Sequence, residues 1–262
     1  MTQTNDAQTS GMGPEPGPLG RVIGVFSSPA KTFESIARKP GWDWLVPVVL
    51  LMIGSFIAQS VMLPKMDVDD AVKTQMKFID KMSKGSIPEE KRAEIETKTR
   101  EGMEAGKRPF RRVLNTLFIL IPILLVPAIY HGLAAAFNAK TTYLKVLSGY
   151  SYTWSIYIVP ILLSALVAMP RASLDATEIQ FQRVLKSNVA AFLDFDSTSK
   201  VLLAVLSSVD IFDIWGFFVG SIALSKTTKF SASAAKYVVG GVWLAYILLK
   251  VCFGGLYSVF MG

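Results

Sequence analysis

The chain has 262 residues, of which 51% are hydrophobic and 18% are charged. An ordinary soluble domain carries about 25% charged residues. The single cysteine, Cys252, excludes a disulfide framework, and with only one histidine the chain has no cysteine or histidine cluster for a metal site. The net charge is +7, but the basic residues flank apolar segments or alternate with acidic ones. We therefore expect an integral membrane protein whose basic residues face the bilayer surface, and no nucleic-acid partner.

The N-terminal part of the chain divides into two segments. Residues 1–20 are rich in glycine, proline and threonine with almost no apolar side chains, which predicts a disordered tail. Within residues 22–39, Ser28 followed by Pro29 is typical of a helix start. The apolar side chains near one face of this helix are Phe26, Phe33 and Ile36. We expect a short interfacial helix lying on the membrane surface.

Five apolar segments follow, each close to the roughly 20 residues that an α-helix needs to cross a bilayer. These predicted spans are residues 44–63, 113–137, 143–169, 201–225 and 237–261. The predicted fold class is therefore all-α, a polytopic membrane domain over residues 21–262. Because five is an odd number, we expect the two termini on opposite sides of the membrane.

The connection over residues 65–112 is the one large segment expected outside the membrane. A first amphipathic helix is indicated by apolar residues at helical spacing, namely Val68, Val72, Met76, Ile79 and Met82. Ser86 and Glu89 resemble a capping box that opens a second helix. Along that helix, glutamate precedes a base by four residues in the pairs Glu94 and Lys98, Glu96 and Arg100, and Glu104 and Arg108. The pattern predicts a charged helical hairpin.

The connection over residues 171–200 has a different pattern. Its apolar residues share a helical face, and that face comprises Phe181, Val184, Leu185, Asn188 and Phe192. We expect a helix lying in the membrane interface. Ser197 or Ser199 is placed to cap the fourth span.

Ionisable residues at membrane depth are the sharpest functional signal. Asp210 and Asp213 lie one helical turn apart in the fourth predicted span, and Lys250 lies in the fifth. At about 1.5 Å per residue, all three fall at a similar depth near the bilayer centre. A charge there costs at least about 2.5–3.5 kcal/mol, so pairing between neighbouring spans is expected.

Two interpretations of these three residues stay open. In the functional one, Asp213 pairs with Lys250, and Asp210 is left as an ion or proton site. In the structural one, the ion pair locks two helices together, and Asp210 accepts hydrogen bonds from hydroxyls such as those of Ser207 or Tyr150.

Small residues in the spans indicate close helix contacts. Gly216 and Gly220 form a small-xxx-small face in the fourth span, which favours packing within the chain or the seam of a homodimer. We also expect Gly149 and Tyr150 of the third span to be helix-packing residues. Enzyme signatures such as a nucleophile elbow, a phosphate-binding loop or a zinc-binding helix are absent from the sequence. We therefore expect no catalytic residues, no cofactor and no metal.

The order of these features resembles the bacterial members of the Yip domain family. The resemblance is carried by Phe26-Ser-Ser-Pro-Ala-Lys-Thr-Phe-Glu-Ser-Ile36 with Pro40-Gly-Trp42, by Gly149-Tyr150, and by Asp210-Ile-Phe-Asp-Ile-Trp215 through Gly220. It extends over roughly residues 20–260. The family comprises five-span proteins named for interaction with Ypt/Rab GTPases in eukaryotes, but the Asp-Leu-Tyr-Gly-Pro motif of those relatives is absent here.

The resemblance implies a non-enzymatic protein of the bacterial inner membrane with a cytoplasmic N-terminus. The basic cluster of residues 107–112, beside the second span, argues for the reverse orientation. We expect a membrane-embedded adaptor or scaffold that binds a protein partner through the 65–112 hairpin or the N-terminal segment. The alternative is a small ion-coupled transporter that uses Asp210, Asp213 and Lys250.

Overall fold

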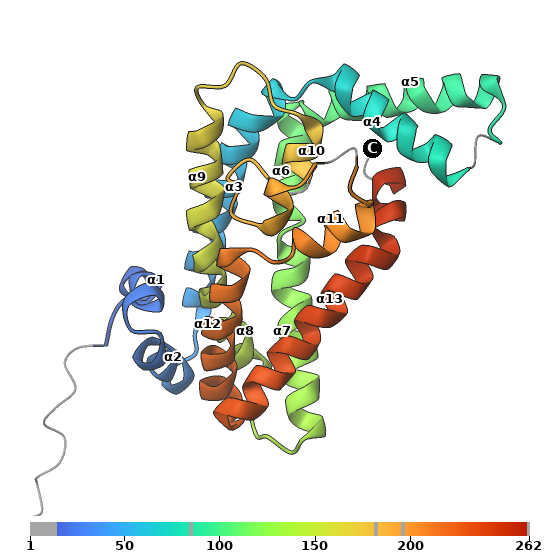
Figure 1. The fold of residues 1–262 in the computed structure, drawn as a ribbon. Coiled ribbons are helices and arrows are strands. Elements are labelled where there is room, and N and C mark those ends of the chain that lie inside the picture. The colour runs from blue at the N-terminus through green and yellow to red at the C-terminus, as the bar shows by residue number, and fades with distance from the viewer. Residues whose placement is uncertain (1–14, 84–85, 181–182, 195–196, 261–262) are drawn as a thin grey trace, which may run out of the picture.

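The computed structural model describes residues 15–83, 86–180, 183–194 and 197–260. Over these residues the regular elements are helices, with two isolated β-bridges, so the predicted all-α class is confirmed (Figure 1). Most of the predicted disordered tail lies outside the described residues. Its predicted end at residue 20 is wrong, because the helix α1 (Pro18–Ser27) already begins at Pro18, a residue favoured in the first turn of a helix.

Four helical stretches are long and apolar enough to cross a membrane within the described part of the chain. They are Trp42–Lys65, Pro109–Ala136, Tyr143–Ala168 and Ala232–Val251. They correspond to the first, second, third and fifth predicted spans. The chain is therefore a polytopic helical membrane protein, while the predicted count of five spans is not confirmed.

The helices inside these stretches are interrupted by short turns. The first contains α3 (Leu45–Met62) between the 3-10 turns η1 (Trp42–Trp44) and η2 (Leu63–Lys65), and the second contains α6 (Pro109–Leu117) and α7 (Leu120–Ala136). The third joins α8 (Tyr143–Thr153) to α9 (Ile158–Ala168) through η3 (Trp154–Tyr157), and the last lies in α13 (Ala232–Phe260).

The fourth predicted span is broken into two helices that run in different directions (Figure 1). α11 (Lys200–Leu206) ends where the hydroxyls of Ser207 and Ser208 donate to the carbonyl of Ala204. α12 (Ile211–Thr228) starts afresh at Asp210, whose carboxylate accepts from the backbone N–H of Phe212 at 2.7 Å. A carboxylate that satisfies a free N–H group at the start of a helix stabilises that start. The prediction of one continuous helix over residues 201–225 is therefore wrong.

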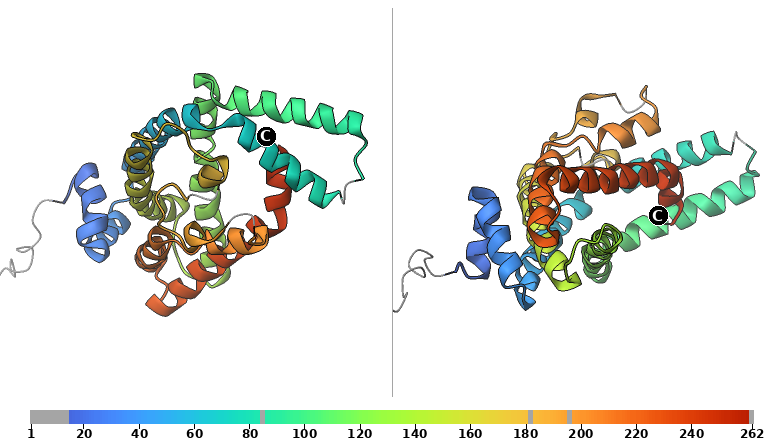
Figure 2. Two further views of the ribbon diagram at one scale, coloured as in Figure 1. Left: turned by 45° about the horizontal axis from the view of Figure 1, so that its top comes forward. Right: turned by 90° about the horizontal axis from the view of Figure 1, so that it is seen from below.

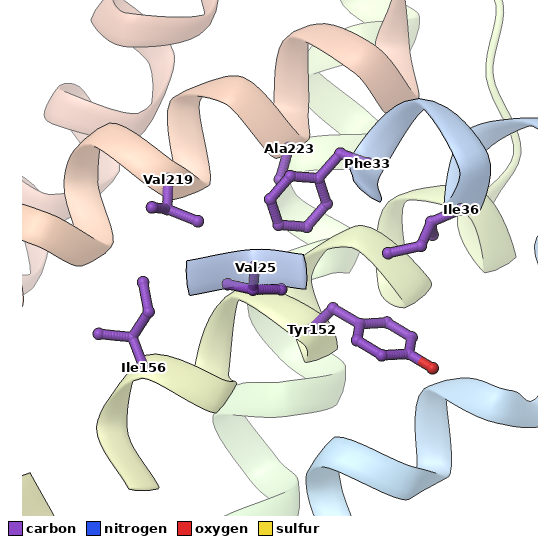
Figure 3. Packing of buried hydrophobic residues seen from close by; sticks show 7 residues of the cluster. All are labelled: Val25, Phe33, Ile36, Tyr152, Ile156, Val219 and Ala223. Atoms are coloured by element: carbon purple, nitrogen blue, oxygen red, sulfur yellow. The ribbon is translucent and has the colours of Figure 1, made fainter. Parts of the chain in front are cut away.

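The N-terminal segment forms two helices that pack into one end of the bundle. α1 is followed by α2 (Pro29–Arg38), which begins after Ser28 as predicted. The apolar face that we expected to meet lipid is instead covered by the protein's own helices. Figure 3 shows the cluster that results, which comprises Val25, Phe33, Ile36, Tyr152, Ile156, Val219 and Ala223.

A buried polar network fixes the same end of the bundle. Arg21 is 5% exposed, forms a salt bridge with Asp43 of η1 and donates to the Ser35 hydroxyl at 3.3 Å. The Tyr152 hydroxyl donates to the Asp43 carboxylate at 3.2 Å. This network joins α1, α2, η1 and α8, and the charge of Arg21 is balanced by Asp43.

The charged hairpin is formed by α4 (Val68–Met82) and α5 (Glu89–Gly106), which project away from the bundle (Figure 1). Four residues of the predicted apolar stripe of α4 pack with Ile95 and Met103 of α5, namely Val68, Val72, Met76 and Ile79. Arg92 donates to Asp80 at 2.9 Å, and Arg100 pairs with Asp69, so ion pairs also join the two helices.

The predicted pairs along α5 form only in part. Lys98 donates to Glu94 at 2.6 Å as predicted, but Arg100 pairs with α4 instead of Glu96. Lys107 forms a salt bridge with Glu104 at 3.9 Å. The capping box is wrong, because Pro88 occupies the N-cap position and the Ser86 hydroxyl donates back to the carbonyl of Ser83.

The described residues between 171 and 199, which are 171–180, 183–194 and 197–199, lie over one end of the bundle, and the single interfacial helix predicted there is wrong. The segment contains α10 (Ala176–Gln180) and the short turn η4 (Val189–Phe192). Asn188 caps η4 and forms a β-bridge with Asp210, so backbone pairing competes with helix formation here. Ser199 caps α11, as predicted. The predicted helical face includes Phe181, which lies outside the described residues.

Lys65, at the end of the first span, forms hydrogen bonds with the chain at the end of α9 and the start of residues 171–199. Its ammonium donates to the carbonyls of Ala168, Met169 and Arg171 at 3.0, 2.5 and 2.7 Å. These carbonyls lie at the end of α9, where the negative end of the helix dipole favours a cation.

Candidate intramembrane site

The bundle encloses a cavity of about 610 Å³. Side chains from α3, α7, α8, α9, α12 and α13 line it, together with residues from the segment before α12. Figure 2 shows these helices arranged around a common centre. The charged side chains of the lining are Asp210, Asp213 and Lys250. The structure thus brings all three sequence-predicted site residues to one cavity.

Lys250 forms hydrogen bonds with two serine hydroxyls. Its ammonium donates to Ser207 Oγ at 2.9 Å and to Ser208 Oγ at 3.1 Å. Both hydroxyls donate their own hydrogen to Ala204, so their lone pairs are available to the ammonium. The two serines that bind the Lys250 ammonium therefore lie at the break between α11 and α12.

Asp210 supports the local structure. It is 6% exposed, one carboxylate oxygen accepts from Phe212 N–H, and the other accepts from the hydroxyl of Ser187. Both oxygens are thus engaged, with partners other than the Ser207 and Tyr150 of the structural interpretation. Asp210 joins the start of α12 to the segment that covers the bundle.

Asp213 is one helical turn further along α12, close to the hydroxyl of Tyr157. Among the described residues, the ion pairs with nitrogen–oxygen distances up to 4.0 Å do not include Asp213 with Lys250. The predicted direct ion pair between Asp213 and Lys250 is therefore wrong, although both residues line one cavity.

The predicted packing glycines make room for side chains of the same protein. A Cβ at Gly216 would lie 2.7 Å from the Tyr157 hydroxyl oxygen, and one at Gly149 would lie 2.8 Å from a methyl group of Thr227. Gly220 is less crowded, with the nearest atom, on Thr153, at 3.6 Å. These contacts explain the glycines by packing within the chain.

Tyr150 belongs to the aromatic wall of the cavity. Its ring makes edge contacts with the rings of Tyr130 and Trp154, at centroid distances of 5.9 Å for both. All three residues line the cavity. Tyr150 thus packs against other aromatic residues of the cavity wall.

Sequence reasoning missed Ser187, Ser208 and Tyr157. The first two contact a charged residue only because the chain turns back before α12, and Tyr157 because η3 faces α12. No spacing in the sequence connects Ser187 to Asp210. The sequence Ser-Ser-Val-Asp at residues 207–210 resembles a helix start. The apolar residues around it nevertheless favoured the prediction of one continuous span.

These elements define the class of protein. A bundle of apolar membrane helices surrounds an internal cavity that carries two carboxylates and one ammonium group, and the described residues contain no group of three ligands for a metal ion. The class is a polytopic helical membrane protein with an ionisable core.

Comparison with known proteins gives the family. Residues 23–253 match the Yip1 domain, and the chain belongs to the Yip1 domain family. It is similar to the membrane protein YknW of Bacillus subtilis (strain 168), with 26% identity over 263 residues that cover 99% of this chain and 96% of YknW. No solved structure matches the chain.

Proposed function

We propose that this protein is a membrane-embedded adaptor that binds a protein partner through the α4–α5 hairpin. The observation that carries the proposal is the division of the hairpin into two faces. The inner face holds the apolar contacts and the ion pairs between α4 and α5. The outer face of α5 presents charged side chains to solvent, and no residue of α5 is buried.

Four exposed residues of α5 form an outer stripe with alternating charge. Lys91, Glu94, Lys98 and Glu101 follow one another at intervals of three or four residues and therefore share one side of the helix. An alternating pattern of this kind selects a partner with the complementary order of charges. The N-terminal segment is less suited to docking, because Phe33 and Ile36 are buried in the bundle.

The test reverses the outer stripe without changing its net charge. A variant with Lys91→Glu, Glu94→Lys, Lys98→Glu and Glu101→Lys keeps a pair of opposite charges at positions 94 and 98 and leaves the inner face intact. Affinity purification from native lipid discs followed by mass spectrometry should lose a partner that the unchanged protein retains.

A matched control reverses an ion pair at the opposite end of the bundle. Glu34 and Lys226 lie 3.8 Å apart, and Glu34→Lys with Lys226→Glu should keep the partner. If the outer-stripe variant retains every partner, the adaptor proposal is wrong.

We further propose that the protein lies in a bacterial inner membrane with α1 and α2 on the cytoplasmic side. Basic residues at that end support this orientation, among them Lys31, Lys39, Lys140 and Lys229. The basic cluster of residues 107–112 lies at the other end and opposes it.

A second candidate function is ion-coupled transport, which is favoured by the position of Asp213 on the cavity wall. Asp213 takes the place that we had assigned to Asp210, since both oxygens of Asp210 are engaged. In proteoliposomes, Asp213→Asn should leave insertion unchanged and abolish proton or sodium flux. Flux equal to that of the unchanged protein, or no flux in either, would exclude transport of these ions through Asp213.

A further inference from the structure

Lys250 forms no salt bridge within 4.0 Å among the described residues. Its two hydrogen-bond partners are the hydroxyls of Ser207 and Ser208, which are neutral. An ammonium group has three hydrogens to donate, so one remains after these two bonds to the described side chains. Lys250 is partly buried, and a buried charge without a directly paired opposite charge is costly, so an anionic group placed at Lys250 would offset that cost.

Asp213 presents the complementary situation on the same cavity. The hydroxyl of Tyr157, which lies close to its carboxylate, is also neutral. Lys250 and Asp213 both line the cavity, yet no ion pair joins them within the described residues. A ligand that carries one charge of each sign would pair with both.

The remainder of the cavity is suited to an apolar chain. Its walls include Leu51, Val126, Trp154 and Ile161, from four different helices, and its volume of about 610 Å³ lies in the range of small-molecule pockets. Because the cavity lies among membrane helices, the amphiphiles within reach are those of the bilayer.

From these observations we propose that the cavity binds a zwitterionic phospholipid of the phosphatidylethanolamine type. Its phosphate lies at Lys250, its ammonium group lies at Asp213, and an acyl chain runs along the apolar wall. The ammonium group donates a hydrogen bond to the Asp213 carboxylate. A quaternary choline has no hydrogen to donate, and phosphatidylglycerol has no cation, so neither satisfies both residues.

The arrangement of α13 allows a lipid to enter from the side. α13 packs on α12 and α11 and leans away from α3 and α9 (Figures 1 and 2). Tyr246 lines the cavity and is 56% exposed, and its neighbours Leu244 and Leu248 are 57% and 65% exposed. On this side one helix separates the cavity from the acyl chains of the bilayer.

The experiment is a lipid titration of the full-length protein in detergent, followed by native mass spectrometry. Phosphatidylethanolamine, phosphatidylcholine and phosphatidylglycerol with identical acyl chains are compared. We expect one molecule of phosphatidylethanolamine to bind at least tenfold more tightly than either of the other lipids. Equal binding of the three lipids, or tighter binding of phosphatidylglycerol, would overturn the proposal.

Variants then assign the preference to the cavity. Lys250→Met and Asp213→Asn should each abolish the tenfold preference, whereas Lys236→Met, a change on the same helix but outside the cavity lining, should retain it. A preference that survives both cavity variants contradicts the proposal. If a cavity variant fails to fold, the comparison of the three lipids on the unchanged protein still decides. The outcome is independent of the hairpin experiment, which changes residues outside the cavity.

Discussion

Lys65 joins the end of the first span to the end of the third through three carbonyl acceptors. Hydrogen bonds from a charged donor contribute about 1.5–3 kcal/mol each when buried, and Lys65 is partly exposed. We therefore expect Lys65→Met to cost about 2 kcal/mol in total. For a chain of this size, this lowers the midpoint of thermal unfolding by about 4–8 °C. Lys73→Met, at an exposed position, should change the midpoint little, and equal midpoints for both variants would contradict this role of Lys65.

Gly216 makes room for the hydroxyl of Tyr157 beside Asp213. Gly216→Ala should destabilise the protein by about 1–3 kcal/mol, because the new methyl group overlaps that hydroxyl. Adding Tyr157→Phe removes the oxygen and should recover part of the loss. Unfolding of the two single variants and the double variant in detergent measures this coupling.

Gly220 supplies the matched control for this prediction. A Cβ there meets only an ordinary contact at 3.6 Å, so Gly220→Ala should be close to neutral. If Gly216→Ala and Gly220→Ala destabilise the protein equally, overlap with the Tyr157 hydroxyl does not explain the effect, because helix propensity alone would favour alanine at both positions.

The α4–α5 hairpin depends in part on an ion pair between its helices. The Arg92 guanidinium beside Asp80 lowers the pKa of that carboxyl below its ordinary value of 3.8. Because the folded-state pKa lies below the unfolded one, the pair stabilises the hairpin at neutral pH. This contribution is lost as the pH falls below about 3.8 and through the lowered pKa.

Spin labels at the exposed positions Lys77 and Glu90 measure this effect. We expect the distance distribution between the labels to stay narrow from pH 8 to about pH 5 and to broaden below about pH 3.8. Asp80→Asn should broaden it at every pH. A distribution that is narrow at all pH values in both proteins would mean that the apolar contacts alone hold the hairpin.

Elements with a long, regular pattern were predictable from the sequence. Local periodicity and composition can be read directly from the sequence. They identify the apolar stripe of α4 and the apolar runs that form α3, α7 and α13. Partners between helices were not predictable in the same way. Arg100 had Glu96 four residues away, but it pairs with Asp69, 31 residues away, because α4 folds back beside α5.

The candidate site was predictable in composition but not in geometry. Asp210, Asp213 and Lys250 do line one cavity, but the depth estimate that grouped them assumed a continuous helix over residues 201–225, which is wrong. Their roles depended on the break before α12, where Asp210 satisfies backbone N–H groups. An apolar run around a carboxylate is compatible with either a continuous helix or a new helix start, and only the surrounding fold decides between them.

The two ends of the bundle carry different elements, which makes the orientation testable. α1, α2 and the turns at residues 137–142 and 229–231 lie at one end, while the hairpin and the segment of residues 171–199 lie at the other (Figure 1). In a background with Cys252→Ser, a cysteine at Lys31 should react with an impermeant maleimide only after the cells are permeabilised. A cysteine at Glu101 should react in intact cells, and the opposite pattern would place the hairpin in the cytoplasm.

α12 is not among the stretches of the described chain that are long and apolar enough to cross a membrane on their own. α13 is such a stretch, and it follows α12 after a short turn in which Lys229 adopts a left-handed conformation. During synthesis, α12 therefore leaves the ribosome as a segment that partitions weakly into lipid until α13 is made. We expect the two helices to leave the translocon together as a pair. The cavity can then form in the bilayer only after the final helix is complete.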